Sequence, residues 1–101
     1  MPIKDRISAS FYILTAKINI CISKIYNRKA KKMNVKARNY IRNAKHISIK
    51  KINYYGKLVD AYIFKADMYL YRATRDHEVV RAIIDRNKVV KNTDPLMENT
   101  L

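Results

Sequence analysis

The sequence predicts an all-α protein, a small helical bundle of three to four helices with a strongly basic second helix. Gly occurs once, at position 56, and Pro only at positions 2 and 95. The segment between the prolines therefore lacks the turn residues that β-rich folds need. Apolar residues also recur at spacings of three and four, the period of an amphipathic helix.

The chain length sets the domain organisation. The 101 residues suffice for one domain with one modest hydrophobic core. We expect a single helical domain over residues 1–92. Asn92 to Pro95 should end its last helix, and residues 93–101 are expected to form a flexible C-terminal tail.

The first predicted helix covers residues 4–26. One side is a continuous apolar stripe formed by Ile7, Phe11, Leu14, Ile18, Cys21, Ile22 and Ile25. The opposite side is polar but uncharged and consists of Ser8, Tyr12, Thr15, Asn19, Ser23 and Tyr26. Either the stripe is the core face of a helix with a bland exterior, or the helix packs against a second partner as well. On the stripe, Cys21 is expected to be a small buried hydrophobe.

The second predicted helix, residues 28–46, has a thin seam of small residues. Ala30, Ala37 and Ala44 fall seven apart, with Met33 and Tyr40 beside them. Basic side chains cover most of the remaining circumference. Repulsion between them costs a few tenths of a kcal/mol per close pair, so counter-charge should increase the order of this helix.

After a bend at residues 45–53, the sequence predicts a third helix over residues 50–73 and a fourth that begins at Thr74 or Asp76. The buried sides combine two series at heptad spacing: Ile52, Val59, Ala66, Ala73 and Val80, and Tyr55, Tyr62, Tyr69 and Ile83. The third helix is apolar on two faces, which indicates a central position or contact with another chain.

An α+β fold is the alternative. Ile18, Ile20 and Ile22 alternate as strand residues do, and a short antiparallel hairpin could turn around Gly56. Both interpretations place the basic stretch, residues 24–57, on a helix.

The charge distribution indicates the class of partner. The net charge is +14, and between Arg6 and Val59 there are fourteen basic side chains and no acidic one. Ordinary protein surfaces mix both signs, whereas a surface of one sign attracts polyanions. We therefore predict nucleic acid, DNA or RNA, as the partner, with contacts to the phosphate backbone largely independent of base sequence. The predicted contact residues are Arg28, Lys29, Lys31, Lys32, Lys36, Arg38, Arg42, Lys45, Lys50 and Lys51.

The sequence does not predict an enzyme, a metal site or a cofactor. His46 and His77 are thirty-one residues apart and belong to no zinc-binding pattern. One Gly cannot supply a phosphate-binding glycine loop. Asp76 and Glu78 beside His77 are better explained as residues of a helix start than as acid-base groups.

Two further functions stay open. The chain could be a structural subunit of a larger nucleoprotein assembly, a virion or ribosome component, whose extra apolar surface is covered by neighbours or by other copies in a homo-oligomer. It could instead bind an anionic membrane surface through the first helix. The N-terminus lacks the pattern of a secretory signal, so we expect a cytoplasmic protein or a component of a nucleoprotein particle.

Overall fold

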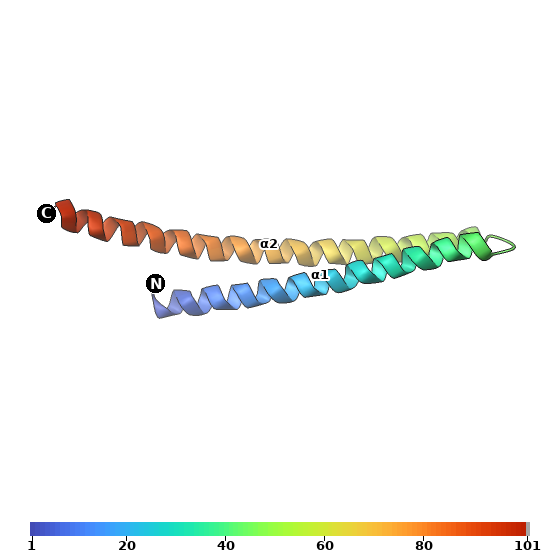
Figure 1. Cartoon of the computed structure of the whole chain (residues 1–101), viewed down its shortest axis with the longest axis horizontal. Coiled ribbons are helices and arrows are strands. Elements are labelled where there is room, and N and C mark those ends of the chain that lie inside the picture. Colours follow the sequence, from blue (N-terminus) through green and yellow to red (C-terminus); the bar gives the residue numbers. More distant parts are fainter. Residues whose placement is uncertain (101) are drawn as a thin grey trace. The chain divides into compact units, whose positions relative to one another are not determined.

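The computed structural model describes residues 1–100, with side chains for residues 1–88. These residues form two helices, α1 (Ile3–Asn43) and α2 (Ile49–Thr100), and no strand (Figure 1). The all-α class is confirmed, but the predicted bundle of three to four helices is wrong. The α+β alternative is also wrong, because Gly56 lies inside α2 and has no positive φ that a hairpin turn could use.

The predicted helices merge in pairs because their proposed boundaries contain no strong helix breaker. Asn27 lies within α1, and Thr74 and Asp76 lie within α2. Asn, Thr and Asp each cost at most about 0.7 kcal/mol relative to Ala in a helix interior, far less than Pro. Such residues cap a helix only where the chain turns away. The second predicted helix is therefore the C-terminal part of α1 up to Asn43 and not a separate helix.

The connection between the helices is residues 44–48, at the start of the predicted bend, and α2 begins at its Ser48 cap. The Lys51 backbone N–H donates to Ser48 Oγ at 3.4 Å, and the Ile52 N–H donates to the Ser48 carbonyl at 3.1 Å. The Ser48 N–H in turn donates to the Tyr40 hydroxyl at 2.8 Å. A tyrosine near the end of α1 thus fixes the residue that starts α2.

The chain divides into two compact units. Unit 1 comprises Met1–Ile18 and Arg72–Leu101, and unit 2 comprises Asn19–Tyr71. Each helix contributes one segment to each unit. The single domain over residues 1–92 and the flexible tail over residues 93–101 stay predictions, but the expected helix end at Asn92 to Pro95 is wrong, because α2 continues to Thr100. Leu101 lies outside the described residues.

Unit 1 has a small apolar core and an ionic contact. Ala9, Val80 and Ile83 form the buried cluster, against which Tyr12 and Val79 pack. Beside it, Arg86 Nη2 donates to Asp5 Oδ1 at 2.8 Å, and Asn87 Nδ2 donates to Asp5 Oδ2 at 3.0 Å. The two carboxylate oxygens of one α1 residue are thereby bound to adjacent residues of α2.

Unit 2 buries small side chains between its two helical segments. Ser23 and Ala30 of α1 are buried, as are Val59 and Ala66 of α2. Ser23 Oγ donates to the Ala66 carbonyl at 2.8 Å. Side chains of this size allow a hydroxyl of one helix to reach the backbone of the other. The predicted heptad series of α2 is confirmed as its buried side.

The apolar stripe of the first predicted helix is not the core face. The buried residues of α1 in unit 1 are Ala9 and Ala16, whereas Ile7, Phe11 and Leu14 are exposed. Cys21 is also exposed, so its predicted burial is wrong. Large side chains cannot occupy a seam this narrow, so the helix buries the side that carries Ala, Ser and Tyr.

We expect Ala66→Leu to lower the free energy of unfolding by about 1–3 kcal/mol, because the added atoms have no space beside Ser23. Urea denaturation followed by circular dichroism measures this change. Ala61→Leu, an exposed position on the same helix, is the matched control and should leave stability nearly unchanged. Equal midpoints for the two variants would contradict the close packing described at Ala66.

The pKa of the Asp5 carboxyl is lowered from its usual value, first by the Asn87 hydrogen bond and then by Arg86. A carboxyl with a lowered folded-state pKa stabilises the fold above its unfolded pKa, and this stability is lost as pH falls through the folded value. We therefore expect acid destabilisation to begin below about pH 4. Thermal unfolding of wild type and Asp5→Asn, measured from neutral pH into acid, tests this. The stability difference between the two proteins at neutral pH should vanish in acid. A stability difference that did not change with pH would refute the prediction.

Candidate functional site

The predicted contact residues all lie in unit 2 and are all exposed. Seven are on α1, one is in the connection and two are on α2. In chain order they are Arg28, Lys29, Lys31, Lys32, Lys36, Arg38 and Arg42, then Lys45, then Lys50 and Lys51. We call this set the basic surface.

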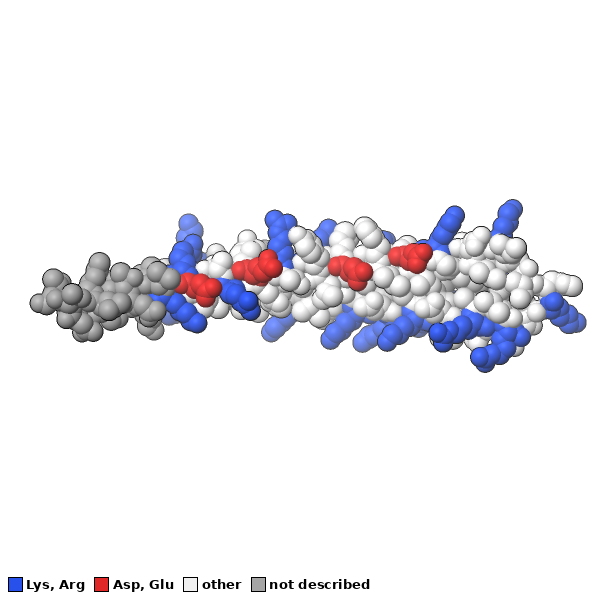
Figure 2. Space-filling model, turned by 90° about the horizontal axis from the view of Figure 1, so that it is seen from above, with Lys and Arg blue, Asp and Glu red and all other residues white. Residues whose placement is uncertain are grey.

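Charge is concentrated in unit 2. Its residues include thirteen Lys and Arg but two Asp, a formal charge of +11 out of the total of +14. Figure 2 shows Lys and Arg side chains extending outward along the borders of the face in view, whereas the acidic side chains lie in its middle. Long basic side chains that extend into solvent can reach a polymer without a change in the backbone.

No carboxylate neutralises the basic surface within the described side chains. Asp60 and Asp67, the acidic residues of unit 2, form no ion pair with any of its ten residues. The ion pair of Asp5 with Arg86 belongs to unit 1. The positive charges of unit 2 are thus available to an external anion.

One row of cations on α1 has regular spacing. Lys24, Lys31 and Arg38 are seven residues apart, which corresponds to about 10 Å along the helix. Lys24 and Lys31 directly follow the buried Ser23 and Ala30, so they lie about 100° around the helix from the seam. A row in this position remains on one side of the helix.

Two lysines lie over a stack of tyrosine rings in unit 2. The Tyr26 ring lies 6.2 Å from the Tyr62 ring and 5.9 Å from the Tyr69 ring, both in stacked geometry. Lys29 Nζ is 5.5 Å and Lys65 Nζ is 5.4 Å from the Tyr26 centroid. Two ammonium groups from different helices thus share one aromatic ring, which attracts cations through its quadrupole.

A second tyrosine group lies near the connection. The Tyr40 and Tyr55 rings are 6.2 Å apart, and Lys51 Nζ lies 4.5 Å from the Tyr40 centroid. Both tyrosines are half-buried, and their rings pack against each other. Tyr54 differs, because its side chain is 60% exposed.

Sequence reasoning did not include Lys65 in the site. It lies thirty-six residues after Lys29, beyond the stretch without acids, and joins Lys29 only because the helices place Tyr62 and Tyr69 against Tyr26. The heptad spacing of Tyr55, Tyr62 and Tyr69 was the available signal. This spacing indicated that the three tyrosines share one helix face, but it did not indicate that the face contacts the Tyr26 ring of α1.

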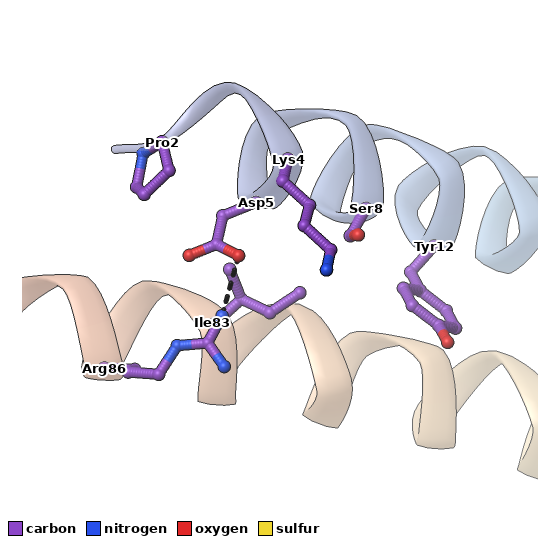
Figure 3. A pocket seen from close by; sticks show the side chains of 7 residues that line it. All are labelled: Pro2, Lys4, Asp5, Ser8, Tyr12, Ile83 and Arg86. Atoms are coloured by element: carbon purple, nitrogen blue, oxygen red, sulfur yellow. Dashed lines mark hydrogen bonds and ion pairs between the residues drawn. The ribbon is translucent and has the colours of Figure 1, made fainter.

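A hollow in unit 1 is lined by the Asp5–Arg86 ion pair. Its volume is about 560 Å³, and Figure 3 shows Pro2, Lys4, Asp5, Ser8, Tyr12, Ile83 and Arg86 around it. The carboxylate of Asp5 is already bound to Arg86 and Asn87. Within the described residues no three metal-ligating side chains come together. Nor does any described helix segment combine the length and apolarity needed to cross a bilayer.

Comparison of the chain with protein-family models, with curated proteins and with solved structures finds no match. No function can therefore be transferred from a relative. The functional proposal rests on the charges and contacts of unit 2.

We expect Tyr26→Leu to lower the stability of unit 2 by about 1–2 kcal/mol, because the variant loses two ring contacts and the attraction of Lys29 and Lys65. Hydrogen exchange of the unit 2 amides measures the effect locally. Tyr71→Leu removes an exposed ring from the same unit and should change protection little. If both variants changed protection equally, the tyrosine stack would have no special role.

Proposed function

We propose that this chain is a small nucleic-acid-binding protein that contacts the phosphate backbone, largely without sequence specificity. The observation that carries the proposal is the basic surface of unit 2, whose ten residues are exposed and unpaired with carboxylates among the described side chains. Phosphate polymers supply the counter-charge that the chain itself lacks. Each neutralised phosphate releases condensed counterions, which favours binding.

The chemistry of the side chains favours backbone contact over base recognition. Lys and Arg donate hydrogen bonds to phosphate oxygens, which fix position but carry no sequence information. Three of the nearby tyrosines that could stack on bases, Tyr26, Tyr40 and Tyr55, are packed against other rings. Double-stranded or structured nucleic acid, which presents phosphates on its outside, is therefore a better fit than unstacked bases.

A second candidate function is a structural role in a larger nucleoprotein assembly. It is favoured by large apolar side chains that remain exposed on both helices, among them Phe11, Phe64 and Tyr71. Exposed apolar surface of this extent is typical of proteins that bind neighbours. In such a particle the basic surface would still contact nucleic acid, so both candidates share one premise.

The proposal predicts strongly salt-dependent binding. We expect the apparent affinity for duplex DNA or RNA to fall by orders of magnitude between about 50 and 200 mM salt. Replacing Arg28, Lys31, Lys32, Arg38 and Arg42 with Gln should reduce the magnitude of the slope of log K against log salt by about 4.5 for duplex DNA if all five contact phosphates. Fluorescence anisotropy with labelled oligonucleotides measures both quantities.

A matched control separates a local site from a general charge effect. Gln substitution of five exposed cations of unit 1, Lys4, Arg6, Arg75, Arg81 and Lys88, removes the same charge. This control should retain most of the wild-type slope. Equal losses in both variants would show diffuse attraction without a site in unit 2, and a wild-type slope near zero would reject nucleic acid as the partner.

A further inference from the structure

The exposed apolar stripe on α1 in unit 1 is unusual in the size of its residues. Ile7, Phe11, Leu14 and Ile18 are 65%, 61%, 58% and 50% exposed. The same helix segment buries Ala9 and Ala16 instead. A helix that covers its small residues and exposes its large ones has a second apolar face with no partner within the described part of the chain.

The spacing of this stripe matches a helical partner. Its residues are separated by four, three and four positions, the alternation of the two core positions in a heptad repeat. This is the pattern of a coiled-coil seam, which stays in contact with another helix over its whole length. A helix lying in a membrane interface usually has a wider apolar face than a coiled-coil seam.

The flanks of the stripe consist mainly of small, uncharged polar side chains. They are Ser8, Ser10 and Thr15 with Lys17, and Lys4 lies one turn before Ile7 on the same side of the helix, so two cations border the stripe. Thr15 Oγ1 already donates to the Phe11 carbonyl at 2.8 Å. Unit 1 as a whole carries nine basic and six acidic residues, a formal charge of +3. Two copies can therefore approach through unit 1 with much weaker repulsion than through unit 2.

We propose that Ile7, Phe11, Leu14 and Ile18 form a dimer seam with the same residues of a second copy, in antiparallel orientation. In this arrangement Phe11 meets Leu14 of the other copy, and Ile7 meets Ile18. Antiparallel pairing offsets the two copies of Lys17 by about 13 Å along the axis, beyond the usual screening length. Parallel pairing would place the two Lys17 side chains at the same level along the axis. Charge therefore selects the antiparallel pair, which is closed by a two-fold axis.

The test uses the full chain, freed of nucleic acid, in sedimentation velocity experiments over the micromolar range. We expect wild type to form a dimer, and the double variant Phe11→Ser with Leu14→Ser to raise the dimer dissociation constant at least about tenfold. Both positions are exposed, so circular dichroism should show the helix content of wild type. A monomeric wild-type chain would overturn the proposal while leaving the proposed nucleic-acid binding intact.

The matched control is the double variant Phe64→Ser with Tyr71→Ser, whose side chains are 69% and 68% exposed on α2 in unit 2. It should dimerise as wild type does. Equal weakening in the two variants would refute the assignment of the seam. Monomeric wild type that floats with vesicles containing an anionic lipid, when the Phe11 and Leu14 variant does not, would assign the stripe to a membrane instead.

Orientation is tested by disulfide formation. Phe11→Cys and Leu14→Cys are each placed on a Cys21→Ser background and mixed in equal amounts under mild oxidation. Antiparallel pairing predicts the mixed disulfide between the two variants, because close approach of the Cα atoms is required. Disulfides that join two copies of the same variant, without the mixed product, would show parallel pairing and overturn the proposed geometry.

Discussion

The close approach of two helices through small side chains is the constraint on which the rest of this structure depends. Within unit 2, Ser23 donates a hydrogen bond directly to the backbone of Ala66, a contact that larger seam residues would prevent. Small residues bury little apolar area, so this seam contributes less hydrophobic stabilisation than one of Leu and Ile would. The large apolar residues are displaced to outer faces, where Phe11 and Phe64 are exposed. The narrow seam and the apolar exterior thus have the same cause, because small residues occupy the seam and large apolar residues occupy the outer faces.

Tyrosine supplies stabilisation at the border of this seam. Rings such as Tyr26 are too large for its centre but can lie half-buried beside it, where they stack on Tyr62 and Tyr69. Their outward side attracts the ammonium groups of Lys29 and Lys65. This arrangement keeps cations at the edge of unit 2 without using carboxylates. A protein stabilised in this way can retain an uncompensated positive surface.

The sequence predicted the helical class and the buried side of α2, because the two heptad series there extend over many turns. It misassigned α1, where two series coexist and the rule that large apolar residues are buried selects Phe11 and Leu14 instead of Ala9 and Ala16. Helix boundaries failed because residues such as Thr74 can cap or continue a helix, and only tertiary contacts decide between the two. The ten cations of the basic surface could be named from the sequence, because they lie in a stretch that contains no acidic residue. The pairing of Lys29 with Lys65 could not be predicted, because it depends on which turns of the two helices meet.

The positive charge of unit 2 also affects its own stability. Close cations on α1, such as Arg28, Lys31 and Lys32, repel one another by a few tenths of a kcal/mol per pair, and no carboxylate among the described side chains offsets this. A phosphate polymer that bound the folded unit would remove part of that repulsion. Linkage then requires that it stabilise the fold by an amount set by its concentration and affinity. The proposed binding of polyanions would therefore be thermodynamically coupled to the helical order of unit 2, because the same side chains determine both.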